Sequence, residues 1–178
     1  MRILLFIIMT MMVTAAVAQP RGAPATVAVC FTPGENCETQ IAAAIDGARR
    51  DVHMQAYGLT STAILQALRR AIERGVKVEA ILDATNEGKR YGAARYLMLA
   101  GAGVWIDDTV AIAHNKVIVI DGTLVIGGSF NFTKAAQNRN AENVTFIESP
   151  AIADLYLANW RARLAASRPY DTGVRRPQ

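Results

Sequence analysis

The sequence predicts a layered α/β domain, and three observations support this fold class. The chain has 178 residues, which is the size of one ordinary domain. Its composition, with 52% hydrophobic and 19% charged residues, is that of a globular protein with a substantial core. Segments with strand character alternate with segments of helical periodicity, and this alternation favours helices layered on a sheet.

The first half of the chain alternates strands and helices. After a stretch rich in Pro and Gly at residues 19–24, short apolar patterns predict strands at 25–31, 51–59, 76–83 and 104–108. Apolar residues at helical spacing predict helices between them, at 37–50, 60–75 and 89–103. The helix at 60–75 has the clearest limits, with Thr60 or Ser61 as N-cap candidate and Gly75 as its stop.

The second half begins with a β-hairpin. Two apolar runs, at 117–120 and 123–126, flank Asp121-Gly122, a pair that suits a two-residue turn with positive φ at both positions. A further strand is predicted at 142–149, followed by a helix at 150–166 that Pro150 opens.

Both ends of the chain are predicted to lie outside the domain of residues 19–168. Residues 1–18 have the features of a cleaved signal peptide: Arg2, an unbroken apolar run, and small residues at Ala16 and Ala18. The alternative is an uncleaved membrane anchor, although the run is shorter than a bilayer span prefers. Residues 169–178 are predicted to form a solvated basic tail.

Charge and cysteine content restrict the function classes only weakly. The formal net charge is +4, and it falls to +3 if the leader with Arg2 is removed, so nucleic acid is permitted as a partner but not required. Cys30 and Cys37 are the only cysteines, and in an exported protein such a pair predicts a disulfide. Free thiols or a metal site remain alternatives, although no clustered His or Cys stands near them.

The open end of the hairpin collects polar side chains. Counting outward from the turn pairs Lys116 with Gly127 and His114 with Ser129, and it places Asn131 diagonal to His114. A register without the two-residue turn would separate His114 from Ser129. An ammonium with hydroxyl and amide groups can neutralise and orient a phosphodiester, and an imidazole is a nucleophile near neutral pH. Each residue alone also fits an ordinary structural role.

The spacing of these residues resembles a known family. His114-x-Lys116, four residues, Asp121, six residues, and Gly128-Ser129-x-Asn131 match the HxK(x)4D(x)6GSxN motif of the phospholipase D superfamily. Residues 57–83 also look like the helix and strand that precede this motif. In size, leader and single motif, the chain looks most like the small bacterial Nuc-type endonucleases. The resemblance implies a layered α-β-α sandwich around a mixed sheet.

The resemblance also implies a mechanism. Larger members carry two copies of the motif, whereas the second histidine here, His53, is followed by Gln55 where the motif needs Lys. We therefore expect a homodimer whose two His114 residues share one site, one forming a phosphohistidine and the other transferring protons. Lysines and amides would act in place of a metal, so neither metal nor cofactor is expected.

Supporting roles are expected for several neighbours. We expect Glu142 to accept a hydrogen bond from the ring nitrogen of His114 that does not attack phosphorus. The alternative is that Glu142 is an ordinary surface residue at the start of a strand. Asp121 and Gly128 are expected to be structural. His53 and Gln55 could line the substrate groove or be ordinary polar residues of the strand. Lys134 and Arg139 are candidate phosphate contacts, which a solvated loop explains equally well.

These features favour a non-specific nuclease that acts on DNA or RNA. The alternatives are a phospholipase, for which only Trp105 and residues 156–160 offer membrane-contact candidates, and a binding module without catalysis. The leader predicts a periplasmic or secreted protein without stable membrane association after cleavage. Sequons at Asn131 and Asn143 lie at the proposed site, where a glycan would obstruct it, and this favours a bacterial source.

Overall fold

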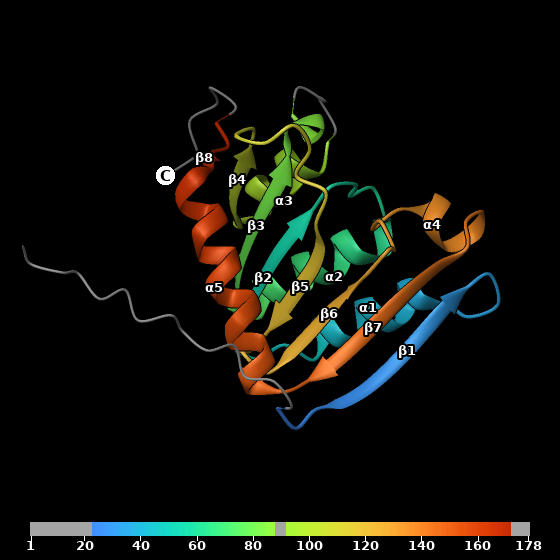
Figure 1. Cartoon of the computed structure of the whole chain (residues 1–178). Coiled ribbons are helices and arrows are strands. Elements are labelled where there is room, and N and C mark those ends of the chain that lie inside the picture. Colours follow the sequence, from blue (N-terminus) through green and yellow to red (C-terminus); the bar gives the residue numbers. More distant parts are fainter. Residues whose placement is uncertain (1–22, 88–91, 172–178) are drawn as a thin grey trace, which may run out of the picture.

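One mixed sheet organises the protein, and the computed structural model describes it through residues 23–87 and 92–171 (Figure 1). The strand order is β1-β7-β6-β5-β2-β3-β4-β8, with β2, β3 and β4 parallel and the other neighbours antiparallel. The strands are β1 (Thr26–Thr32), β2 (Asp51–Ala56), β3 (Lys77–Asp83), β4 (Gly103–Asp107), β5 (Lys116–Ile120), β6 (Leu124–Gly128), β7 (Glu142–Glu148) and β8 (Arg168–Pro169). The helices are α1 (Cys37–Asp46), α2 (Thr62–Glu73), α3 (Ala93–Ala100), α4 (Lys134–Asn138) and α5 (Pro150–Ala166), with a 3-10 turn η1 (Ala84–Asn86). The predicted fold class is confirmed.

The helix limits follow local sequence signals. Ser61 caps α2, because its Oγ accepts a hydrogen bond from Ile64 N at 3.1 Å. The chain leaves this helix through Gly75, whose φ is +86°. Pro150 occupies the first turn of α5, as predicted. Within residues 23–87 and 92–171, no helix has both the length and the apolar character needed to cross a bilayer.

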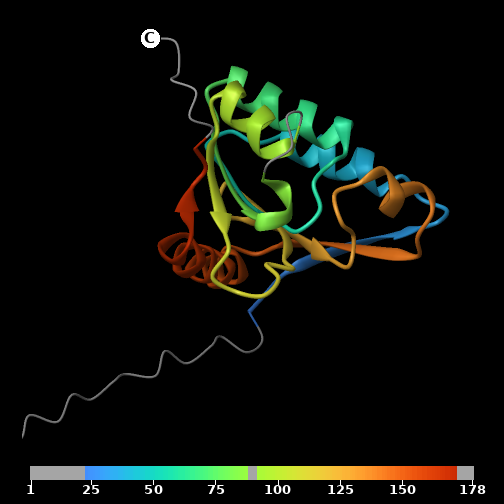
Figure 2. The same ribbon diagram turned by 90° about the horizontal axis from the view of Figure 1, so that it is seen from above.

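The two faces of the sheet are covered unequally. Helices α1, α2 and α3 lie on one face, and α5 lies on the other (Figures 1 and 2). Helix α5 contacts β2, β4, β5 and β6, while no helix of residues 23–87 and 92–171 lies over β1 and β7 on that side (Figure 1). Val27, Val29 and Phe31 are 57%, 52% and 53% exposed there. Because Cys30 faces α1 and strand residues alternate, these three side chains form an apolar surface on the α5 side.

Three short elements were not expected. Helix α4 lies in a segment interpreted as a solvated loop, and Thr133 caps it by accepting from Ala136 N at 3.2 Å. Turn η1 follows β3 directly. Strand β8 pairs with β4 and includes Pro169, so the sheet extends into the first residue assigned to the tail. The predicted leader and residues 172–178 lie outside the described part of the chain.

The predicted register of the hairpin is wrong by one residue. Asp121 and Gly122 both have positive φ, +53° and +64°, as the predicted turn requires. Thr123 N donates to Ile120 O at 3.0 Å. The ladder nevertheless pairs Ile120 with Leu124, so Thr123 is an additional residue between the Asp121-Gly122 turn and β6.

The cause of the shift is a contact that the hairpin sequence does not contain. Thr123 O accepts from Ser149 N at 2.9 Å, beside the start of α5. Both faces of the hairpin are apolar and covered, so the sequence offers no alternation that would fix the register. The predicted pairs of Lys116 with Gly127 and of His114 with Ser129 are not formed. On the other side of β6, Gly127 pairs with Thr145 of β7.

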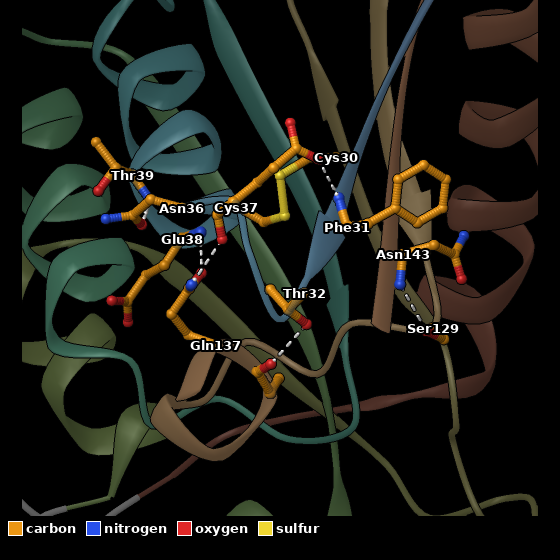
Figure 3. The surroundings of a disulfide bond; sticks show 12 residues. Cys30, Phe31, Thr32, Asn36, Cys37, Glu38, Thr39, Ser129, Gln137 and Asn143 are labelled. Carbon is orange, nitrogen blue, oxygen red and sulfur yellow. Dashed lines mark hydrogen bonds between the residues drawn. A yellow bond between two sulfur atoms is a disulfide. The ribbon is translucent and has the colours of Figure 1, made fainter. Parts of the chain in front are cut away.

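The predicted disulfide is present and joins the end of β1 to the start of α1 (Figure 3). Cys30 and Cys37 are fully buried, with their Cα atoms 5.7 Å apart. Gln137 of α4 accepts from Glu38 N and donates to Glu35 O, both at 2.9 Å. The bridge therefore stabilises the segment against which α4 packs.

Removing the bridge is expected to destabilise the fold. A protein with Cys30→Ala and Cys37→Ala should lose about 2.5 kcal/mol of unfolding free energy, because the unfolded chain gains the entropy of an open loop. Urea denaturation of the oxidised protein and the double variant measures the difference. Reduced wild-type protein should unfold at the midpoint of the variant, and equal midpoints for all three samples would contradict the expectation.

Candidate active site

The motif histidine and lysine meet an aromatic ring at the open end of the hairpin. His114 lies just before β5 and is exposed, whereas Lys116 is only 7% exposed. Lys116 Nζ donates to the backbone oxygen of His114 at 2.8 Å. The ring of Tyr57 lies 4.7 Å from the His114 ring and 5.2 Å from Lys116 Nζ, centroid distances in both cases. An imidazole open to solvent is thus held beside a buried ammonium.

Burial makes this ammonium a strong anion ligand. Burial lowers the pKa of Lys116 below its ordinary value, and the Glu142 carboxylate acts in the opposite direction. A partly desolvated cation gains more from a bound anion than a hydrated one does, because little water must be displaced. The position therefore suits the non-bridging oxygens of a phosphodiester.

Ser129 and Glu142 form a pair beside this centre. Ser129 Oγ donates to Glu142 Oε2 at 2.6 Å, and it accepts from Asn143 N at 3.1 Å (Figure 3). Asn140 Nδ2 donates to the other carboxylate oxygen at 2.8 Å. Within the described part of one chain, Glu142 thus bonds to Ser129 and Asn140 and forms no hydrogen bond with His114. The expected link from His114 to Glu142 remains a prediction.

Asn131 reaches the site through a backbone connection between two loops. Phe132 N donates to Gly58 O at 2.9 Å, and Phe132 O accepts from Thr60 N at 2.9 Å. A Cβ at Gly58 would lie 3.3 Å from Asn131 Oδ1, so glycine permits this close approach. Among the described residues, the buried Asn131 Oδ1 has no hydrogen-bond donor. The amide is therefore available to a ligand that brings its own donor.

Two buried residues that sequence reasoning missed position the histidine. Asp83, 4% exposed at the end of β3, accepts from Ala113 N at 2.8 Å through Oδ2. Asn86 Nδ2 donates to Tyr57 O at 2.8 Å. Burial raises the pKa of Asp83, but hydrogen bonds from Thr85 and Ala113 outweigh it and the pKa lies below its ordinary value. A carboxylate at the carboxyl end of a parallel strand was the available signal, because such ends border sites.

Asp121 and Gly128 support the hairpin. The Asp121 carboxylate accepts from the backbone N–H groups of Arg49, Arg50 and Asp51 at 2.9, 2.7 and 3.1 Å. Burial raises the pKa of Asp121, but these donors hold it below the ordinary value. A Cβ at Gly128 would lie 2.2 Å from Asn143 O, and its φ is +141°. Both contacts tie the hairpin to neighbouring backbone, away from the His114 ring.

An Asp121 substitution is expected to show in stability and its pH dependence. Asp121→Ala should lower the unfolding free energy by about 2 kcal/mol, because three backbone N–H groups lose a charged acceptor. The folded-state pKa lies below 3.8, so this contribution is present above pH 3.8 and is lost as pH falls through the folded value. Denaturation midpoints of wild type and variant should therefore converge in acid. A constant gap down to the acid limit would contradict this origin.

The structure separates the two candidate groove residues of β2. His53 Nδ1 lies 3.5 Å from Asp51, its Nε2 lies 3.2 Å from Glu79, and its ring packs edge-on against Trp160. Burial lowers the pKa of His53, although both carboxylates oppose this effect. In the sheet, His53 of β2 lies opposite Val119, in the interior of β5. It is therefore not brought to the open end of the hairpin, where His114 lies. Gln55 pairs with Val117 and accepts from Asn115 Nδ2 at 3.1 Å, adjacent to His114 in sequence.

Two basic side chains, Lys134 and Arg139, flank the site. Lys134 begins α4 and Arg139 caps its end, and both are exposed. Across residues 23–87 and 92–171, no group of three or more His, Cys, Asp or Glu is placed to hold a metal ion. The described side chains can therefore supply a nucleophile, a cation and neutral hydrogen-bonding groups.

Comparisons with known proteins indicate the family and the fold. Residues 41–163 match the family described as "Cardiolipin synthase, PLD-like domain". A protein named Phospholipase D from Rickettsia bellii is 48% identical over 139 residues, which cover 78% of this chain and 69% of the relative. The crystal structure of a phospholipase D family member, Nuc from Salmonella typhimurium, superimposes with a TM-score of 0.78 at 34% identity. That alignment covers 84% of this chain and 100% of the other.

A third likeness concerns the fold alone. NucT from Helicobacter pylori superimposes with a TM-score of 0.75 at 20% identity, covering 83% of this chain and 100% of the other. The resemblance predicted from the motif, including the likeness to Nuc, is therefore confirmed. The family match over residues 41–163 and the 48% identity to the protein from Rickettsia bellii lead to one conclusion: the chain belongs to the phospholipase D-like family.

Proposed function

We propose that this phosphodiester hydrolase is an endonuclease that cleaves DNA or RNA through a phosphohistidine in a site shared by two copies. Family membership supports phosphodiester hydrolysis in general. The observation that carries the finer proposal is the exposed imidazole of His114 beside the buried ammonium of Lys116. The sequence likeness to Nuc-type endonucleases supports nucleic acid as the substrate.

The proposed reaction needs two imidazoles, and each chain supplies one at the hairpin end. A ring nitrogen of one His114 attacks phosphorus, a P–N bond forms, and the ester P–O bond breaks. The leaving oxygen takes a proton from the second His114, which then removes a proton from water. The water oxygen displaces the first histidine and breaks the P–N bond. Lys116, Ser129 and Asn131 stabilise the charge on phosphorus.

Glu142 is the proposed orienting carboxylate for an imidazole N–H. Each carboxylate oxygen has more than one lone pair, so the bonds from Ser129 and Asn140 leave capacity for a further donor. Asp121 and Gly128 are proposed to be structural, and Lys134 with Arg139 to contact the phosphate backbone. Contacts of this kind attract nucleic acid without reading its sequence.

The apolar surface of Val27, Val29 and Phe31 supports pairing with a second copy. These side chains are more than half exposed on a sheet face that no described helix covers. Phe31 pairs with Asn143, which in turn bonds to Ser129, so the surface ends at the active site (Figure 3). Contact through this face would bring the two hairpin ends together. Stable pairing generally buries about 800 Å² on each partner.

A second candidate function is phospholipid hydrolysis, and two observations favour it. The relative from Rickettsia bellii carries the name Phospholipase D. Val110 and Ile112, 42% and 56% exposed, lie in the loop that leads to His114 and could enter a lipid surface. The candidates suggested by the sequence fit less well, because Trp160 is buried and donates to Met54 O at 3.1 Å. Trp105 packs edge-on against it.

Parallel assays with a chelator distinguish these candidates. Plasmid DNA should be nicked and then degraded in excess EDTA, while phosphatidylcholine vesicles release little or no choline. Loss of DNA cleavage in EDTA would contradict the metal-free mechanism. Faster turnover of vesicles, abolished in a Val110→Ser, Ile112→Ser protein that still pairs, would instead favour the lipid function.

We further propose that the protein works outside the cytoplasm, in the periplasm or after secretion. The disulfide between Cys30 and Cys37 indicates an oxidising compartment. The predicted leader would direct the chain there.

A further inference from the structure

A small pocket lies between α5 and the strands β2 and β5, next to the catalytic histidine. Its volume is about 220 Å³, and its lining residues are Gln55, Asn115, Val117, Leu155, Tyr156 and Asn159. Asn115 stands between His114 and Lys116 in the sequence, so its side chain points to the opposite side of the chain from that of Lys116. Because β5 begins at Lys116, a ligand held both at the phosphate site and in this pocket would pass over the open end of the strand.

Gln55 at the pocket has an incomplete set of hydrogen bonds. The residue is 5% exposed, and its Oε1 accepts from Asn115 Nδ2 at 3.1 Å. Its Nε2 is buried and has no acceptor among the residues that the structure describes. A buried donor without an acceptor destabilises a fold, and a leucine of similar size would avoid that cost. An acceptor brought by a ligand would satisfy the Gln55 amide.

The lining chemistry restricts the ligand. None of the lining residues is charged, which disfavours phosphate, choline or an amine as occupant. The three carboxamides offer donors and acceptors of the kind that read the edge of a nucleobase, and a hydrogen bond between Gln55 and Asn115 holds two of them. Tyr156, 36% exposed, provides a ring for stacking, and Val117 with Leu155 provides apolar walls.

We propose that this pocket binds one nucleobase of the nucleotide adjoining the scissile phosphate. The inference rests on the proposed nuclease function and adds a base contact to a site otherwise built for phosphates. A base that enters the pocket cannot remain paired, so single-stranded substrate or a locally opened duplex is preferred. The Gln55 amide supplies a donor to the base edge, and Asn159 lies at the exposed rim.

The direct test compares substrates with and without the base. Single-stranded oligonucleotides with one cleavable linkage carry either normal nucleotides or an abasic sugar on one side of that linkage. Bis(p-nitrophenyl) phosphate serves as a diester without any base. For wild-type protein, kcat/KM should be about tenfold higher with the normal oligonucleotide than with the one whose abasic sugar replaces the nucleotide that enters the pocket.

Variants locate the effect in the pocket. Asn159→Ala and Gln55→Leu should each remove most of the preference for the normal oligonucleotide, and Asn159→Ala should leave hydrolysis of bis(p-nitrophenyl) phosphate unchanged. Gln55→Leu should also melt at or above the wild-type temperature, because the unsatisfied buried amide is gone. Gln40→Ala, an exposed carboxamide on α1, is the matched control and should retain both the preference and the stability.

The outcomes separate this inference from the function on which it rests. Equal kcat/KM for normal and abasic oligonucleotides would overturn the base pocket and leave the nuclease intact. A Gln55→Leu protein that melts far below wild type would likewise overturn it, since the amide would then be structural. Hydrolysis of the chromogenic diester without cleavage of any oligonucleotide would overturn the nuclease function itself.

Discussion

His114→Ala protein is expected to lose at least about 10⁴-fold in DNA cleavage, because nucleophile and proton donor disappear together. The folding free energy should change little, since the His114 ring is exposed and its one described contact is the Tyr57 ring. Gel assays of plasmid cleavage, with thermal melting as the fold control, measure both quantities. Retention of more than a few per cent of activity would remove His114 from the mechanism.

The sharper form of this experiment uses mixed dimers. Wild-type and His114→Ala chains carrying different affinity tags are co-expressed, and the mixed species is isolated through both tags. If both imidazoles serve one site, the mixed dimer is nearly inactive. Half of the wild-type activity would show that each chain works alone. Mass spectrometry of rapidly quenched wild-type reactions should place the transferred phosphoryl group on His114.

Phe31→Glu combined with Val29→Glu is expected to convert the protein to monomers and to abolish DNA cleavage. Two carboxylates on the uncovered face of β1 would have to lose their water on pairing, which costs far more than the pair can regain. The monomer should remain folded, because both side chains are already more than half exposed. Sedimentation velocity, melting temperature and plasmid cleavage are the three readouts.

Thr26→Glu provides the matched control for the interface. It adds a charge to the same strand, but strand alternation places it on the opposite face from Phe31 and Val29. This protein should sediment and cleave as wild type does. A Phe31→Glu, Val29→Glu protein that stays paired and active would show that the subunits meet elsewhere. A folded monomer with full activity would contradict the shared site.

Much of the fold could be predicted from local patterns. Periodicity indicated the main helices and strands, Pro150 marked the start of α5, and the cysteine pair indicated the disulfide. The hairpin register could not be predicted, because both of its faces are apolar and Ser149, remote in sequence, selects the pairing of Thr123. Helix α4 was missed because its five residues have no apolar periodicity.

The candidate site divides in the same way. Motif spacing identified His114, Lys116 and Ser129 because they lie in one segment. The partners of Asp83 and Asn86 could not be assigned from pattern, since Ala113 and Tyr57 lie 30 and 29 residues away. Side-chain partners at such separations depend on tertiary packing. The contact between Glu142 and Ser129 could not be predicted either, because it depends on β6 and β7 being neighbours in the sheet.

The covalent bond at Cys30 has a consequence for assembly. Cys30 lies between Val29 and Phe31, so its tether to α1 also fixes the orientation of both apolar neighbours. In a reducing cytosol this stretch of edge strand would lose its anchor, and two chains would meet through a looser surface. Under the proposed function, in which only the paired protein cuts, full activity would follow oxidation, at a distance from the genome of the cell that makes the protein.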